Sequence, residues 1–111
     1  MFLDRRRRPL AIRCLTRGSD GFTVVDPRQI LRVAVELGAT GIILAHNHPS
    51  GGPTPSEHDR TVTRRVARAG DLLGVRLLDH LIVGHEGYRS LAEEGLLDEL
   101  LAQDFGDRSA L

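Results

Sequence analysis

The chain has 111 residues, which is enough for one compact domain with its own hydrophobic core and leaves no room for a second. Lysine plus arginine and aspartate plus glutamate each number 15, so the formal net charge is zero and overall charge gives no reason to expect a polyanionic partner. The only cysteine, Cys14, excludes an internal disulfide, and its apolar-rich surroundings predict a small packed side chain. Because no signal-like segment or apolar run near the roughly 20 residues of a membrane span occurs, we expect a cytoplasmic protein with no membrane partner.

The N-terminal third predicts short extended segments. The run Arg5-Arg6-Arg7-Arg8 either contacts phosphate or forms a solvated hairpin turn, and we favour the turn. Residues 9–16 then predict a strand and 18–21 a turn. Residues 22–25 predict a second extended segment, which could pair with the strand before it.

A helix and a buried strand follow. Asp26 is a good N-cap and Pro27 suits the first helical position, while Gly38 predicts a left-handed C-terminal cap. Between them the apolar residues recur at helical spacing, at Ile30, Val33, Ala34 and Leu37. Residues 41–46 are apolar on both faces, as expected of a central strand.

The C-terminal half repeats this alternation. A helix is predicted from near Ser56 to Gly74, with Val62, Val66, Ala69 and Leu73 on one face. Residues 76–84 predict a strand, 87–90 a turn or short strand, and 91–101 a helix interrupted at Gly95. The whole pattern indicates an α/β domain over residues 1–104, followed by a frayed tail at 105–111.

The residues suited to chemistry lie between the buried strand and the second helix. His46 and His48 are two apart at the strand's end, so both imidazoles point to one face. Pro49 and the glycines after it force a turn, which brings Asp59 back in the first turn of the helix. Two histidines and a carboxylate with a fourth position open are typical of a hydrolytic zinc centre, in which the pKa of bound water falls to about 7.

Simpler interpretations of the same residues remain open. Ser56-x-x-Asp59 is also a helix capping box, and from this spacing alone capping is the favoured interpretation. The two histidines could equally be ordinary polar residues at a strand end.

At these residues the sequence resembles the RadC-like branch of the JAB/MPN metalloproteins, whose JAMM signature is His-x-His, seven residues, then Ser-x-x-Asp. His48 and Ser56 have that separation. The resemblance covers about Phe2 to Leu97 and includes further motifs, namely Asp26-Pro27-Arg28, His46-Asn47-His48-Pro49-Ser50-Gly51, Pro53-Thr54-Pro55-Ser56 and Leu78-Asp79-His80-Leu81-Ile82-Val83-Gly84.

The resemblance implies a three-layer α/β/α domain with a mixed central sheet, related to the cytidine deaminase fold. It also implies that His46, His48 and Asp59 bind Zn²⁺ and that Ser56 stabilises a developing oxyanion. JAMM peptidases use in addition a glutamate on an early strand as general base. In the proteins that the sequence resembles, that glutamate lies a few residues before the segment resembling Phe2-Leu3-Asp4, which implies a position upstream of Met1. The only glutamate before the signature, Glu36, falls on the first helix and is expected to face solvent.

Two functions are therefore compared. The first is a zinc-dependent metallopeptidase-like hydrolase that cleaves an amide or isopeptide bond of a peptide or protein substrate, inactive here if the glutamate is missing. The second is a non-catalytic, zinc-stabilised binding module associated with DNA repair or mobile elements. Four aromatic residues give no stacking platform for single strands, which weakens the case for nucleic acid.

Overall fold

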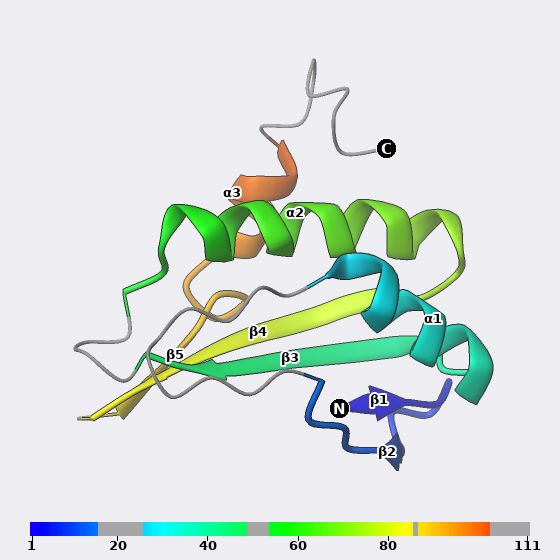
Figure 1. Cartoon of the computed structure of the whole chain (residues 1–111). Helices are drawn as coiled ribbons and strands as arrows, with labels where there is room; N and C mark the ends of the chain where they lie inside the picture. Colours follow the sequence, from blue (N-terminus) through cyan, green and yellow to red (C-terminus); the bar gives the residue numbers. More distant parts are fainter. Residues whose placement is uncertain (16–25, 49–53, 86, 103–111) are drawn as a thin grey trace.

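The computed structural model describes residues 1–15, 26–48, 54–85 and 87–102 (Figure 1). Its elements in chain order are β1 (Phe2–Leu3), β2 (Pro9–Ala11), α1 (Pro27–Leu37), β3 (Gly41–Asn47), α2 (Glu57–Leu72), β4 (Arg76–Gly84), β5 (Gly87–Ser90) and α3 (Leu96–Ala102). The strands form one sheet in the order β2-β1-β3-β4-β5. The pair β3 and β4 is parallel and the other pairs are antiparallel, which confirms the predicted α/β class with a mixed sheet.

The arginine run forms the turn of the β1–β2 hairpin, as favoured from the sequence. The Asp4 carboxylate holds this turn together by accepting the backbone N–H groups of Arg6 and Arg8, both within 2.9 Å. The strand after the turn ends at Ala11, which is shorter than the predicted 9–16. The prediction of a packed Cys14 is wrong: its side chain is exposed, because it lies beyond the end of an edge strand. Predictions for residues 16–25 fall outside the described residues.

Local sequence signals explain the helix boundaries. Asp26 caps α1 by accepting the backbone N–H of Arg28, and Gly38 ends the helix at φ 68°, both as predicted. The helix α3 begins only after Gly95, whereas the sequence predicted a helix from residue 91. The reason is that Gly95 takes a left-handed φ of 75°, and the preceding residues form turns in which the Ser90 hydroxyl accepts the Glu93 N–H.

The helices gather on one side of the sheet. In Figure 1, α2 runs along β3 and β4, and α2 contacts both α1 and α3. A single hydrophobic core fills the space between these helices and the sheet, and its members include Phe2, Ile30, Leu31, Ala34, Ile42, Val62, Val66, Leu77 and Ile82.

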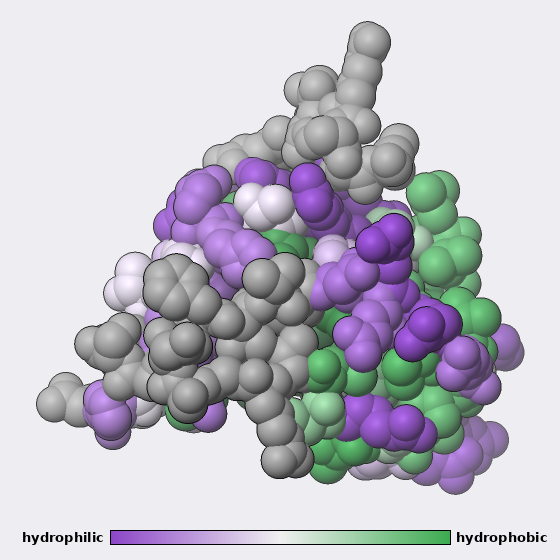
Figure 2. Space-filling model, viewed as in Figure 1, coloured by the Kyte–Doolittle hydropathy of each residue, from purple (hydrophilic) through white to green (hydrophobic). Residues whose placement is uncertain are grey.

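Exposed apolar side chains gather in one region of the surface that the structure describes. Figure 2 shows hydrophobic residues gathered on the side where α1 and the C-terminal end of α2 lie. The exposed large hydrophobic side chains of these segments are Val35, Leu72 and Leu73. Within the described parts of the chain, every helix is too short or too polar to cross a bilayer.

Candidate metal centre

The strand β3 delivers the two histidines. Ile42 and Leu44 face the helices, and His46 follows on the same side because side chains alternate along a strand. His48 lies just after the strand, where its backbone N–H donates to the Val83 carbonyl at 2.8 Å and so continues the parallel ladder with β4. The two imidazole centroids are 4.8 Å apart, and both rings contact Asp59 at the beginning of α2.

The first turn of α2 delivers the carboxylate. Ser56 is the N-cap, and its hydroxyl accepts the Asp59 backbone N–H at 3.1 Å. In return the Asp59 Oδ2 atom accepts the Ser56 backbone N–H at 2.7 Å. This reciprocal capping box fixes both the backbone and the side chain of Asp59 before any other partner is considered.

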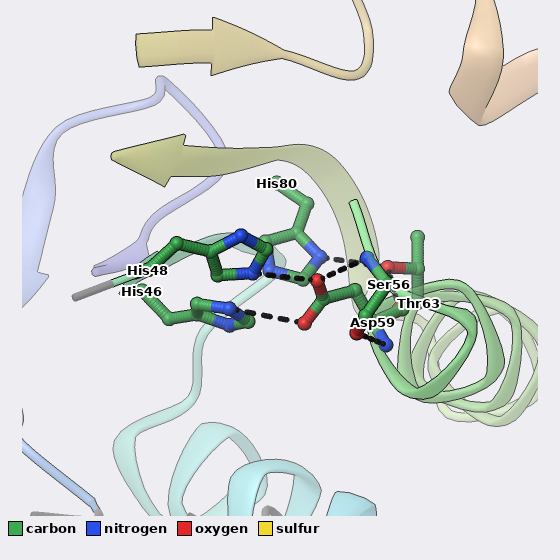
Figure 3. A network of polar contacts seen from close by, with 6 residues as sticks. All are labelled: His46, His48, Ser56, Asp59, Thr63 and His80. Atoms are coloured by element: carbon green, nitrogen blue, oxygen red, sulfur yellow. Dashed lines mark hydrogen bonds and ion pairs between the residues drawn. The ribbon is translucent and has the colours of Figure 1, made fainter. Parts of the chain in front are cut away.

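The three side chains meet at one point, as Figure 3 shows. His46 Nε2 lies 3.0 Å from Asp59 Oδ1, and His48 Nε2 lies 2.9 Å from Asp59 Oδ2. The Asp59 side chain is only 3% exposed, whereas those of His46 and His48 are 32% and 20% exposed. The carboxylate therefore forms the floor of the centre and the imidazoles form its open side.

Capping and ligand placement are not alternatives in this structure. The sequence allowed Ser56-x-x-Asp59 to be either a capping box or part of a metal centre, and the capping box is present. Because one lone pair of Oδ2 accepts the Ser56 N–H, the remaining lone pairs of the carboxylate face the imidazoles. The capping box is thus the device that aims Asp59 at His46 and His48.

The environment favours the protonation states that a metal ion requires. Burial lowers the pKa of His46 below its ordinary value, against the attraction of Asp59, so the neutral imidazole is favoured. Burial alone would raise the pKa of Asp59, but the hydrogen bond from the Ser56 N–H and the neighbouring imidazole outweigh it, so its pKa is lowered. A neutral imidazole and an ionised carboxylate are the ligand forms of these residues.

The donor set fits a small divalent cation. The ligand atoms of His46, His48 and Asp59 all lie within 4.8 Å of one another. Ligands at zinc's usual bond lengths stand about 3.4 Å apart in a tetrahedron, so only small side-chain shifts separate this arrangement from a coordinated one. Two imidazoles and a carboxylate suit zinc and several other transition metals, so the group could bind a metal ion whose identity the geometry does not fix.

Other candidate residues are exposed and lie outside the group of three potential ligands. His58 is exposed, as expected from its neighbouring position on the helix. Glu36 is also exposed and forms an ion pair with Arg32 at 3.9 Å on α1, which agrees with the solvent-facing position expected for it.

Two further residues lie beside the three potential ligands, and the sequence alone predicts no definite role for them. His80 is 2% exposed on β4, and its ring packs edge-on against His46 with centroids 5.5 Å apart. Thr63 is fully buried on α2, one helical turn after Asp59, and its hydroxyl lies 2.7 Å from His80 Nδ1. Burial lowers the pKa of His80 to about 4, so this imidazole is neutral at neutral pH. The spacing of four residues from Asp59 could have indicated that Thr63 lies on the same helix face, but no sequence signal connects Thr63 with His80.

The fold and the three converging side chains define a small α/β domain with a candidate metal site. Over residues 1–96 the sequence matches the RadC-like JAB domain family, and the chain belongs to that family. It is 43% identical over 97 residues to a UPF0758 protein of Symbiobacterium thermophilum and 45% identical over 95 residues to one of Thermotoga maritima. These alignments cover 87% and 86% of this chain but 42% and 43% of the relatives, so the chain spans less than half of their length.

Proposed function

We propose that this domain is a zinc-dependent, JAMM-type hydrolase that cleaves an amide or isopeptide bond of a peptide or protein. The observation that carries the proposal is the convergence of His46, His48 and Asp59 at a partly open centre. Zinc held by three protein ligands activates water for attack on a carbonyl and polarises that carbonyl. The family membership of the chain supports the same reaction class.

The remaining chemistry falls to residues around the three ligands. Ser56 uses its hydroxyl oxygen to accept the Asp59 N–H, which leaves its own hydroxyl proton to donate. A hydroxyl placed in this way beside the metal centre is suited to stabilise the oxyanion that forms when a carbonyl is attacked. Ser56 is therefore the proposed catalytic residue among those that the structure describes.

The strand β1 indicates where a general base would fit. It runs antiparallel to β3, with Phe2 opposite Ile42 and Leu3 opposite Gly41, and the Met1 ammonium donates to the Ile43 carbonyl at 2.8 Å. If a segment ahead of Met1 continued this register, its third and fifth positions before Met1 would lie opposite His46 and His48. Paired residues share a face of the sheet, so a glutamate at either position would point toward the centre.

The first experiment is elemental analysis of purified protein, comparing wild type with His48→Ala and Asp59→Ala. The proposal predicts about one zinc per chain in wild type and loss of zinc in both variants. His58→Ala is the matched control, because this exposed histidine adjoins Asp59 and is expected to leave zinc content unchanged. Wild-type protein without metal would contradict the proposal.

Activity needs its own test. Zinc-loaded protein is assayed on a panel of peptide and isopeptide substrates, alone and with a glutamate-bearing extension of β1 joined ahead of Met1. We expect cleavage that requires the glutamate and disappears in His46→Ala. A panel that is not cleaved in either form would leave the domain a metal-binding module and not a hydrolase.

Nucleic-acid binding is the second candidate, and one observation favours it. Arg5, Arg6 and Arg7 are exposed at the tip of the β1–β2 hairpin, whereas Arg8 pairs with Asp4 at 2.9 Å. Binding through these arginines would weaken steeply with salt and would survive removal of the metal. Neutralising Arg5, Arg6 and Arg7 together tests it, because an unchanged affinity for DNA would exclude the hairpin as the contact.

A further inference from the structure

We infer that His80 is a positioning residue of the metal centre and that it acts through Thr63, whose hydroxyl oxygen accepts a hydrogen bond from the His80 Nδ1–H. This inference rests on the proposed function, because it concerns the same three ligands. It adds a residue from a strand that contributes no ligand.

The direction of the hydrogen bonds follows from the donors available. The Thr63 hydroxyl lies 2.6 Å from the backbone carbonyl oxygen of Asp59, which can only accept. The single hydroxyl proton of Thr63 is therefore committed to Asp59. The 2.7 Å contact between Thr63 and His80 must then be a bond from the His80 Nδ1–H to the Thr63 oxygen.

The result is a buried chain of two hydrogen bonds that points from β4 to α2. Thr63 is 0% and His80 is 2% exposed, so neither bond competes with solvent. Each bond in such a chain polarises the next and strengthens it. The chain ends on the backbone of Asp59, whose amide and carboxylate are already held by Ser56.

His80 also touches a second ligand. Its ring meets the His46 ring at 70° with centroids 5.5 Å apart, so the position of the His80 ring limits how far His46 can tilt. One buried side chain thus fixes the backbone of Asp59 through Thr63 and supports the imidazole of His46 directly (Figure 3). Outer contacts of this kind change metal affinity by about 10- to 100-fold when they are removed.

The neighbouring residue supplies a natural contrast. Asp79 precedes His80 on β4 and faces the other way, where its carboxylate accepts the Ser90 hydroxyl. Ser90 is 3% exposed, so its hydroxyl is as buried as that of Thr63 but has no contact with the three ligands. Ser90→Ala is therefore a matched control for a buried hydroxyl whose loss affects stability alone.

The experiment measures zinc affinity by chelator competition at neutral pH, on full-length variants shown to be folded by circular dichroism. We expect Thr63→Val and His80→Leu each to weaken zinc binding by about 10- to 100-fold. Thr63→Ser keeps the hydroxyl and is expected to stay within a few-fold of wild type. His80→Asn places an amide N–H where Nδ1 stood but lacks the ring beside His46, so its zinc affinity is expected to lie between those of wild type and His80→Leu. Ser90→Ala is expected to lower the melting temperature and leave zinc affinity unchanged.

The pathway through Thr63 is tested by the double variant Thr63→Val with His80→Leu. If the two residues act as one chain, the double variant binds zinc about as weakly as the worse single variant. Fully additive losses, or single variants with wild-type affinity, would overturn the inference while leaving the metal centre intact. Wild-type protein that binds no zinc would instead overturn the proposed centre, and the positioning role with it.

The tautomer has a direct readout. Long-range proton–nitrogen correlation spectra of metal-free protein are expected to show a proton on His80 Nδ1, and Thr63→Val is expected to abolish the preference for Nδ1 over Nε2. A proton on Nε2 in wild type would contradict the hydrogen-bond direction and overturn the inference.

Discussion

Asp59 and Asp79 lie on opposite sides of the sheet, and their carboxylates have different kinds of hydrogen-bond partner. Asp59 accepts one backbone N–H, from Ser56, and otherwise meets two imidazole nitrogens. A neutral imidazole can carry its proton on either ring nitrogen and so can offer Nε2 as a ligand, which allows these partners to rearrange around a cation. Asp59 is therefore held in place, but its two histidine partners can still rearrange.

Asp79 is sealed. Its Oδ1 accepts the backbone N–H groups of His80 at 2.7 Å and Ala92 at 3.0 Å, and its Oδ2 accepts the Ser90 hydroxyl. These donors belong to the backbone and to a buried side chain, so the network ties β4 to the turn after β5 and has a structural role. The two carboxylates thus differ in their partners, because those of Asp59 are side chains that could bind a metal ion, whereas those of Asp79 are backbone N–H groups and a hydroxyl.

The largest expected effect is a difference in zinc affinity between variants of the two carboxylates. Asp59→Asn keeps an oxygen for the Ser56 N–H but loses the anionic ligand, so zinc affinity is expected to fall by more than the about 100-fold typical of outer contacts. Asp79→Asn is expected to retain wild-type affinity. Chelator competition measures both, and equal losses would contradict the contrast.

The second effect concerns pH and the histidine between the two carboxylates. The pKa of His80 is about 4 in the folded protein, whereas its ordinary value is 6.5. Below pH 6.5 the unfolded chain therefore binds a proton at this residue that the folded chain does not bind. The free energy of unfolding of metal-free protein should therefore fall as pH drops from 6.5 toward 4, by about 3 kcal/mol at most. Urea denaturation at several pH values measures this slope. His80→Asn is expected to flatten it, and an unchanged slope would assign the effect to other groups.

The third effect is the stability counterpart of the first. Asp79→Asn cannot accept all three donors, and leaving a buried donor unpaired is expected to cost about 1–3 kcal/mol of unfolding free energy. Urea denaturation of the metal-free variant checks this value. A variant as stable as wild type would mean that solvent replaces the lost bonds.

The smallest effect is expected at the helix cap. Ser56→Ala removes the acceptor for the Asp59 N–H and should lower the unfolding free energy by about 1 kcal/mol. The Ser56 backbone N–H still holds the carboxylate, so zinc affinity should fall by less than about tenfold. If the domain hydrolyses a substrate, the loss in kcat should exceed the loss in zinc affinity. Equal losses would limit Ser56 to a capping role.

Part of the fold could be predicted because its signals are local. The caps at Asp26 and Gly38 depend on a few neighbouring residues and were predicted correctly, as was the hairpin turn at Arg5–Arg8. The strand from Pro9 is present but ends earlier than predicted, and the exposure of Cys14 was predicted wrongly, since neither a strand's end nor a side chain's burial depends on local sequence alone. A strand continues only while a neighbour pairs with it, and a side chain is buried only where another element covers it.

By itself the sequence determined which residues could meet at the centre. Strand alternation put His46 and His48 on one face, and the helix start put Asp59 in the first turn of α2. Only the tertiary structure showed that the capping box also directs the Asp59 carboxylate toward the two histidines. It alone also showed that His80 on β4 contacts Thr63 on α2. The physical reason is distance along the chain: His80 and Thr63 are 17 positions apart, and only the packing of a parallel strand against a helix brings them within hydrogen-bonding reach.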